Sequence, residues 1–243
     1  MCSPHSIAEL LAELKLLLAN RSLAPRSILC VNAHIYNLAC RDEILRHRLN
    51  EARIVAADGM AIVWAARLLG HCISERCNMT EAYHAFLSNG TMPSNEGILI
   101  GCSLAEASAA AEKTNRESRH CRIVEACSGF LSEAEYRDIF AAHAEIDCVF
   151  LGMGSPKTES LAEMAAALCP RAIVWGIGGG TIRIEAGTMT EAPEIWRRLG
   201  LQWMHRLGLE PAAVWRRYLL GNPLFAIRIL RQAWKQRASK QHC

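Results

Sequence analysis

The chain has 243 residues, of which 51% are hydrophobic and 21% charged, and its net charge is +3. This length suits one large domain or a domain with an appendage, and the composition excludes a disordered, collagen-like or coiled-coil protein. The longest apolar runs are about half as long as a membrane-spanning helix requires, and the eleven cysteines show no CxxC spacing, which indicates reduced thiols in the cytosol.

Short runs of β-forming residues alternate with helical patterns along most of the chain. The first helix is predicted by apolar residues at helical spacing: Ile7, Leu10, Leu11, Leu14 and Leu18. A surface loop is predicted at 89–96 and a helix at 103–113. Six buried strands are predicted at residues 27–31, 53–56, 97–101, 121–125, 147–151 and 172–175. Strands that alternate with helices form a parallel sheet, so we predict an α/β, Rossmann-like fold flanked by helices.

Polar residues and glycines follow the predicted strands. Ligands of a parallel sheet bind at the carboxyl ends of its strands, where the chain leaves the sheet. Five strands end in such residues: Asn32 and His34, Asp58 and Gly59, Gly101 and Ser103, residues 152–157, and Gly176 with residues 178–181. We therefore expect one binding site along this edge.

The turn Gly152-Met-Gly-Ser-Pro-Lys-Thr-Glu159 has the residues of a phosphate-binding helix N-terminus. Ser155 suits the N-cap and Pro156 the first helical position, so free N–H groups and Lys157 would face one point. An ordinary capped turn would use the same residues. The predicted substrate-binding residues are Gly152, Gly154, Ser155, Pro156, Lys157, Thr158 and Glu159 here, and Gly178, Gly179, Gly180, Thr181 and Arg183 in the next turn.

Asp58 is the predicted catalytic carboxylate. A carboxylate at the end of an apolar strand can have a raised pKa and act as a general base, whereas the alternative is the N-cap of a helix that begins near Met60. The chain has no Asp-x-Asp, HExxH or zinc spacing, and Thr181 replaces the last glycine of a GxGxxG. We therefore predict neither a metal nor a cofactor. His34 and His84 are predicted to be structural.

The strand pattern stops after Gly187, and three helices are predicted at 193–208, 211–219 and 223–237, each opened by proline. We therefore divide the chain into a catalytic domain at 1–190 and a helical appendage at 191–243.

The end of the chain is basic and rich in tryptophan. Residues 193–243 carry ten Lys and Arg against two Asp and Glu, whereas residues 1–192 carry 17 against 22. Tryptophans beside cations suit a surface that faces anionic lipid headgroups. Nucleic acid is not expected as a partner, because the body is acidic and no recognition motif is present. The predicted membrane-binding residues are Arg206, Trp215, Arg216, Arg217, Arg228, Arg231 and Trp234.

Several longer sequence blocks match the pattern of one known protein family. They are Asn32-Ala-His34, Ala57-Asp-Gly-Met60, Val63 to Gly70, Gly152 to Glu159, Ala186-Gly187, Ala192-Pro193, Leu199 to Trp203, Arg206-Leu207, Glu210-Pro211 and Trp215 to Tyr218. In this order, across residues 27–230, they resemble the WecG/TagA/CpsF glycosyltransferases.

The resemblance implies an inverting, metal-independent transferase that moves a sugar from a UDP-sugar to an undecaprenyl-pyrophosphate-linked sugar. It places the enzyme peripherally on the cytoplasmic face of the inner membrane. It also implies that Asp58 is the base that deprotonates the acceptor hydroxyl, and that Asn32 and Arg76 lie in the catalytic site. The appendage would hold the enzyme on the membrane and close over that site. A homodimer in solution is left open.

Departures from the family pattern concern the substrate. Thr158 stands where glutamine is usual, Cys30 where threonine is usual and Arg183 where aspartate is common, and residues 77–81 differ from a Val-Thr-Gly-x-Asp block. The variant glycine-rich turn looks closest to the xanthan-type exopolysaccharide branch, which implies UDP-glucose as donor and a β-1,4 linkage. The alternatives are transfer of N-acetylmannosamine or N-acetylmannosaminuronate, and a non-catalytic scaffold that binds nucleotide-sugar or lipid.

Overall fold

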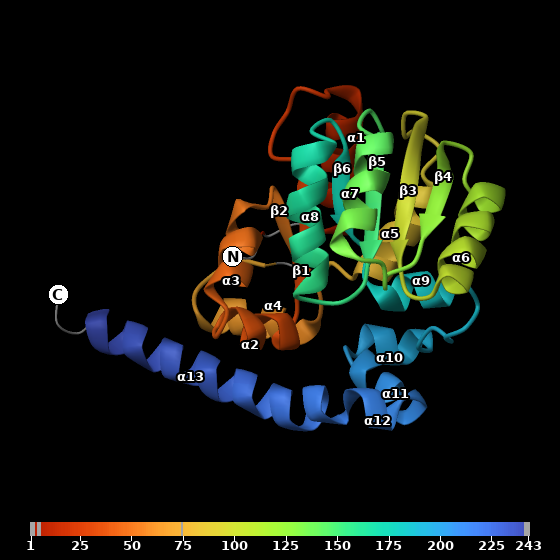
Figure 1. Ribbon diagram of the computed structural model, residues 1–243. Helices are drawn as coiled ribbons and strands as arrows, with labels where there is room; N and C mark the ends of the chain where they lie inside the picture. The colour runs from red at the N-terminus through yellow and green to blue at the C-terminus, as the bar shows by residue number, and fades with distance from the viewer. Residues whose placement is uncertain (1–2, 4–5, 74, 241–243) are drawn as a thin grey trace.

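The computed structural model describes residue 3, residues 6–73 and residues 75–240. Its centre is a six-stranded parallel sheet in the order β2-β1-β6-β5-β3-β4 (Figure 1). The strands are β1 (Ser27–Val31), β2 (Ile54–Ala57), β3 (Asn95–Gly101), β4 (Cys121–Cys127), β5 (Cys148–Gly152) and β6 (Ile173–Gly176). The predicted α/β, Rossmann-like sheet flanked by helices is confirmed.

Helices bury both faces of the sheet. One face packs against α2 (Ala33–Ala39), α3 (Glu43–Glu51), α4 (Met60–Leu68), α7 (Glu133–Ala142) and α8 (Lys157–Leu168). The other face packs against α1 (Ile7–Ala19), α5 (Met79–Ser88), α6 (Leu104–Glu117) and α9 (Gly179–Glu185). On this second face Trp175 is fully buried, with ring centroids 6.0 Å from Tyr83 and 5.7 Å from Phe86. Apolar burial on both faces explains why the strands read as nearly continuous apolar runs.

The strand boundaries differ from the prediction at the polar ends of β3 and β4. β3 begins at Asn95, inside the predicted loop, because the Asn95 N–H donates to His120 O at 2.7 Å. β4 extends to Cys127, which pairs with Ile100. β4 is an edge strand in which exposed Arg122 and Val124 alternate with buried residues. Its last two residues, Ala126 and Cys127, lack the β-branched or aromatic side chains that predict a strand.

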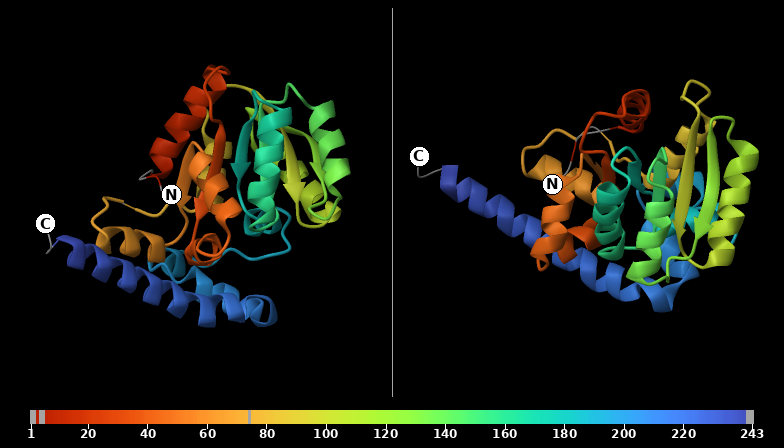
Figure 2. Two further views of the ribbon diagram at one scale, coloured as in Figure 1. Left: turned by 60° about the vertical axis from the view of Figure 1, so that its left-hand side comes forward. Right: turned by 45° about the horizontal axis from the view of Figure 1, so that its top comes forward.

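The appendage contains α10 (Glu194–Arg198), α11 (Gln202–Leu209), α12 (Pro211–Trp215), a π-helical turn η1 (Arg216–Leu220) and α13 (Gly221–Lys240). The predicted helix at 193–208 is interrupted at Gly200, which has a φ of +71°. The other two predicted helices are continuous through η1. Pro223 therefore does not begin a helix but lies two residues inside α13, close behind the π-helical turn, which ends at Leu220. Figure 2 shows the appendage crossing below the body, with α13 extending past it.

Candidate active site

A cavity of about 970 Å³ lies at the carboxyl ends of the strands, between the sheet and the appendage. Its walls include residues that follow β1, β2, β3, β5 and β6, together with residues of α4, α11, η1 and α13. Cavities of this size bind whole small-molecule ligands. The strand ends selected from the sequence therefore converge on one site, as a parallel sheet requires.

Asp58 lines this cavity directly after β2. Its N–H donates to Val31 O at 2.9 Å, and its Oδ1 accepts from Asn78 Nδ2 at 3.1 Å. Asp58 caps no helix, because the N-cap of α4 is Gly59 and no side chain caps that helix. The carboxylate therefore lies at the cavity wall and is not engaged in a helix-capping hydrogen bond with backbone N–H groups.

Burial raises the pKa of Asp58 above its ordinary value. The charge of Arg217 opposes this rise most strongly, and hydrogen bonds from Asn32 and Asn78 and the charge of Arg76 oppose it further. A carboxylate with a raised pKa that is held in place by amides is suited to accept a proton from a hydroxyl.

Asn32 follows β1 and is positioned by the helix that it caps. Its Oδ1 accepts hydrogen bonds from the N–H groups of His34 and Ile35, each at 3.1 Å. Its amide nitrogen is thereby left for the hydrogen bond to Asp58. Asn32 and Asp58 thus lie together, as the sequence predicted.

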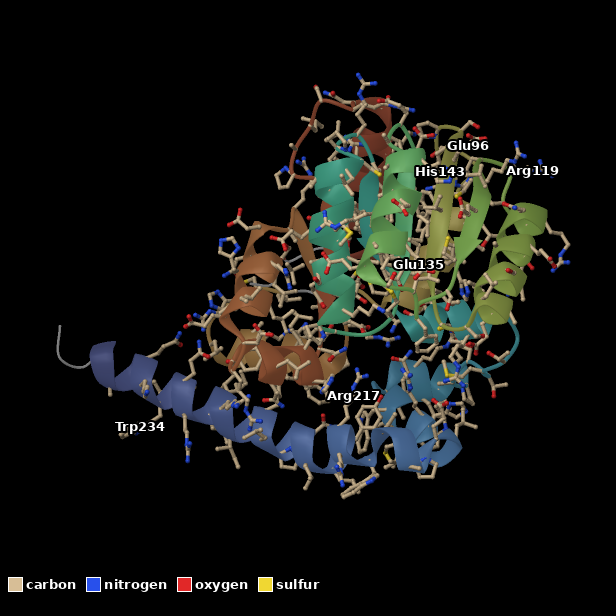
Figure 3. The ribbon with its side chains drawn as sticks, viewed as in Figure 1. Glu96, Arg119, Glu135, His143, Arg217 and Trp234 are labelled. Atoms are coloured by element: carbon tan, nitrogen blue, oxygen red, sulfur yellow. The ribbon has the colours of Figure 1, made fainter. Side chains whose placement is uncertain are left out.

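Arg217 reaches the cavity from η1 in the appendage. Figure 3 shows it between the appendage and the body. Besides its effect on Asp58, its charge acts with burial to lower the pKa of His34, which also lines the cavity. The structure therefore places Arg217 beside the candidate base, although the sequence grouped it with the membrane-binding residues.

Arg76 lies just outside the cavity and joins the body to the appendage. Its guanidinium donates to Glu81 Oε1 at 2.6 Å and to Gln202 Oε1 at 2.5 Å. The remaining influence of Arg76 on Asp58 is its charge. Arg76 thus lies close to the cavity, and its guanidinium donates hydrogen bonds to Glu81 and Gln202.

The turn after β5 differs in detail from the predicted cap. α8 begins at Lys157 with Pro156 as its N-cap, one residue later than predicted, and no side chain caps it. Ser155 Oγ donates instead to Glu159 Oε1 at 2.5 Å, and Thr158 Oγ1 donates to Gly154 O at 3.2 Å. The residues of this turn that line the cavity are Gly152, Met153, Gly154, Ser155, Thr158 and Glu159, whereas Pro156, also predicted to bind substrate, does not line it. Burial raises the pKa of Glu159.

Lys157 does not line the cavity. Its Nζ donates to Gly129 O at 2.8 Å and lies 5.1 Å from the centre of the Tyr136 ring. The Tyr136 hydroxyl in turn donates to Ser128 O at 3.1 Å. Lys157 therefore fixes the loop after β4, and the structure does not bring it to the phosphate position that the sequence suggested.

The second glycine-rich turn forms the middle of the cavity wall. Gly178, Gly179, Gly180, Thr181 and Arg183 all line it. Thr181 Oγ1 donates to Ile177 O at 2.7 Å and lies 2.9 Å from Thr80 Oγ1.

Arg183 is paired with acidic side chains. Its guanidinium lies 2.6 Å from Glu210 of the appendage and 3.4 Å from Glu106 of α6. These contacts tie the appendage to the body and neutralise the cation that the sequence had assigned to substrate.

Several cavity residues were missed by the sequence reasoning. Trp64 and Leu68 of α4 line the cavity although they are 58% and 44% exposed. Phe130, in the loop that Lys157 fixes, is 81% exposed at the cavity wall. The only signal available was the position of Phe130 after a strand and the absence of charge along one face of α4.

The predicted membrane-binding residues separate into two groups. Arg206 and Arg217 line the cavity, and Arg228 donates to Asn37 Oδ1 at 2.7 Å. The remaining four are exposed: Trp215, Arg216, Arg231 and Trp234. Figure 3 shows Trp234 directed away from the body. Among the described helices, none has the length and apolar character needed to cross a membrane.

No three histidine, cysteine, aspartate or glutamate side chains of the described residues gather where they could hold a metal ion. The described residues of the cavity offer instead three arginines (Arg183, Arg206 and Arg217), the side-chain amides and the backbone of the two glycine-rich turns.

Comparison with known proteins identifies the family of the chain. Residues 2–239 match the model of the glycosyl transferase WecG/TagA/CpsF family. The chain is also similar to the N-acetylglucosaminyldiphosphoundecaprenol N-acetyl-beta-D-mannosaminyltransferase of Bacillus subtilis (strain 168). The two are 25% identical over 202 residues, which cover 83% of this chain and 78% of that protein. The chain therefore belongs to the WecG/TagA/CpsF family of glycosyl transferases.

Proposed function

We propose that the protein transfers N-acetylmannosamine from its UDP conjugate to a polyprenyl-diphosphate-linked N-acetylglucosamine. The observation that carries the chemistry is Asp58, whose burial raises its pKa inside a cavity that also holds Arg217. The sugar and the acceptor are taken from the name of the Bacillus subtilis relative.

The reaction is a single displacement. Asp58 accepts the proton of the acceptor hydroxyl as that oxygen attacks the anomeric carbon of the donor sugar. The bond from this carbon to the UDP oxygen breaks, UDP leaves, and the configuration inverts. Asp58 then loses its proton to solvent. Asn32 and Asn78 hold the carboxylate in position, and Arg217 and Arg206 stabilise the charge on the departing diphosphate.

In this proposal the donor lies across the carboxyl ends of the strands. Its diphosphate faces the glycine-rich turns after β5 and β6, where backbone N–H groups favour anions. Its base lies toward the exposed ring of Phe130, which offers a stacking surface. Because β2 and β4 are opposite edges of the sheet, Asp58 and Phe130 mark the two ends of the donor side.

The choice of donor sugar depends on two side chains, Thr158 and Arg183, and on the relative's name. UDP-glucose was favoured because of Thr158 and Arg183, but the polar groups of both side chains are engaged within the protein. This removes the main reason to expect a changed sugar pocket. The relative's name supports the N-acetylmannosamine alternative, and transfer of glucose or N-acetylmannosaminuronate stays an untested prediction.

The test is UDP release from UDP-N-acetylmannosamine, UDP-glucose and UDP-N-acetylmannosaminuronate, each with N-acetylglucosamine- or glucose-diphosphoryl-lipid. Release that requires both UDP-N-acetylmannosamine and the N-acetylglucosamine lipid is expected. Release from UDP-glucose alone would overturn the sugar assignment. Binding of UDP-sugars without release under any pairing would favour the scaffold. Retained turnover in excess EDTA is the expected result for metal independence.

We also propose that the enzyme is peripheral on the cytoplasmic membrane face. The exposed side chains of Trp215, Arg216, Arg231 and Trp234 support contact with anionic lipid. The acceptor itself is a membrane lipid in this proposal, so membrane contact brings the enzyme to its substrate.

A further inference from the structure

Two apolar helix faces line one arm of the cavity. On α4 they are Met60, Ala61, Trp64, Ala65 and Leu68, and on α13 they are Asn222, Phe225, Ala226, Ile229 and Leu230. Within each helix these positions have the spacing of a single face. None of them carries a charge. We call this arm the α4–α13 groove.

The α4–α13 groove has a buried floor and open lips. Ala65, Phe225 and Ile229 are buried, whereas Trp64 and Leu68 are half exposed and Leu230 is 60% exposed. Apolar side chains gathered on both sides of an open groove are a mark of an apolar ligand or partner.

α13 is held beside this groove by specific contacts with α2. Asn37 Nδ2 donates to Gly221 O at 2.7 Å, and Arg228 Nη1 donates to Asn37 Oδ1 at 2.7 Å and to Asn37 O at 2.9 Å. The ring centroids of Tyr36 and Phe225 are 5.2 Å apart in an edge-to-face arrangement. Since these contacts fix α13 on α2, the groove against α4 is preformed.

The groove leads outward from the catalytic residues. α4 begins two residues after Asp58, and α13 begins four residues after Arg217. Both helices therefore begin near Asp58 and Arg217, and the groove between them extends away from these two residues. From Met60 to Leu68 the wall is about 12 Å long at the helical rise per residue. Past Leu230 the exposed Arg231 and Trp234 follow on α13.

We propose that the α4–α13 groove binds the first isoprene units of the polyprenyl chain of the acceptor. This deepens the proposed function and rests on it. With the acceptor hydroxyl at Asp58, the polyprenyl chain leaves between the two helices toward the membrane surface. Burial of each apolar methylene stabilises the complex, so a few isoprene units are enough to discriminate a prenyl lipid from a short-chain analogue.

The kinetic test fills the groove from α13. Ala226 lines it and its neighbour Ile227 does not, and both are exposed, so Ala226→Trp and Ile227→Trp form a matched pair. Each is assayed with the same sugar diphosphate on a polyprenyl chain and on a short alkyl chain. In Ala226→Trp the ratio of kcat/KM for the polyprenyl over the short-chain acceptor should fall at least about tenfold. In Ile227→Trp the ratio should stay at the wild-type value. An equal loss for both acceptors, or no loss, would overturn the proposal.

A labelling test does not depend on transfer. A farnesyl diphosphate that carries a benzophenone should label peptides containing 60–68 and 222–230, and Ala226→Trp should abolish this labelling while its thermal unfolding matches that of Ile227→Trp. Labelling elsewhere contradicts the groove assignment. Loss of label to phosphatidylglycerol vesicles, but not to unlabelled farnesyl diphosphate, would assign the groove to a bilayer lipid and also contradict it. Correct labelling by a protein that transfers no sugar would leave the groove in place and refute the proposed function.

Discussion

At the scale of single residues, the position and the pKa of Asp58 are set by its neighbours. Its backbone is fixed to β1, Asn78 and Asn32 hold its carboxylate, and burial raises its pKa while Arg217 limits the rise. A base must be deprotonated to act, so the raised pKa predicts that activity falls as the pH is lowered through it. The arginine that tunes this pKa comes from the appendage.

Arg217→Gln should move the acid limb of the kcat/KM profile. Removing the cation removes the influence that most strongly lowers the pKa of Asp58, so that pKa rises further and the limb shifts to higher pH. The neighbouring Arg216, whose guanidinium lies 5.3 Å from the Trp215 ring, does not line the cavity, and Arg216→Gln in detergent should leave the limb in place. An unmoved limb in Arg217→Gln would show that the two groups do not interact.

Lys157→Met should lower stability more than donor affinity. The side chain donates to Gly129 O, so its loss should reduce the free energy of unfolding by about 1–2 kcal/mol in urea titrations. Affinity for UDP should change by less than about threefold, because the ammonium group does not face the cavity. A tenfold loss of UDP affinity at unchanged stability would restore the phosphate-binding role.

At the scale of elements, the order of strands and helices was predictable because the buried strands are apolar runs between helical patterns. The converging strand ends were predictable for the same reason. The direction of Lys157 and the pairing of Arg183 were not, because both depend on partners far away in the chain, Gly129 and Glu210. Arg217 lies in the π-helical turn, and no local sequence pattern predicted that turn, so its position at the cavity could not be predicted.

α9, which continues the second glycine-rich turn, is anchored by an ionic cluster. The carboxylate of Glu185 is buried, lies 2.5 Å from His84 Nε2 of α5 and 3.3 Å from Lys113 Nζ of α6. The hydrogen bond to Glu185 raises the pKa of His84. Burial opposes ionisation of Glu185, yet the hydrogen bond and charge of His84 and the charge of Lys113 leave its pKa lowered. His84, predicted to be structural, thus joins α5 to α9.

His84→Ala should therefore destabilise the protein in a pH-dependent way. A raised pKa in the folded state gives stability that is complete below the unfolded pKa of histidine and is lost as the pH rises through the folded pKa. Glu185 acts in the opposite sense and loses its contribution only in acid. We expect a loss of about 1–2 kcal/mol in urea unfolding at about pH 6, discounted for the partial exposure of His84, and a smaller loss at about pH 9. A loss that is the same at both values would contradict the ion pair.

At the scale of the whole molecule, the appendage has two separable jobs in this account. It lines the cavity with Arg206 and Arg217, and we propose that its exposed tryptophans and arginines contact the membrane. The polar contacts through Arg76 and Arg183 connect it to the body at two points.

Serine at Trp215, Arg216, Arg231 and Trp234 together should separate these jobs. Sedimentation with anionic vesicles should fall by more than about tenfold, at about 1 kcal/mol per basic residue, and the effect should shrink with salt. Transfer to an acceptor dissolved in detergent should persist. Truncation after Glu191 should abolish both, since it removes Arg206 and Arg217. Wild-type vesicle binding by the truncated chain would refute the membrane role of the appendage.

The most direct test of the account is a single-turnover measurement on Asp58→Asn in detergent, with saturating UDP-N-acetylmannosamine and N-acetylglucosaminyl-diphosphoryl-polyprenol. Asparagine keeps the shape of the side chain and cannot accept the proton, so the rate of UDP release should fall by about 10² to 10⁴-fold, equivalent to about 3–5 kcal/mol of barrier, while UDP still binds. Near wild-type release from Asp58→Asn would contradict the central claim that this carboxylate is the base of a sugar transfer.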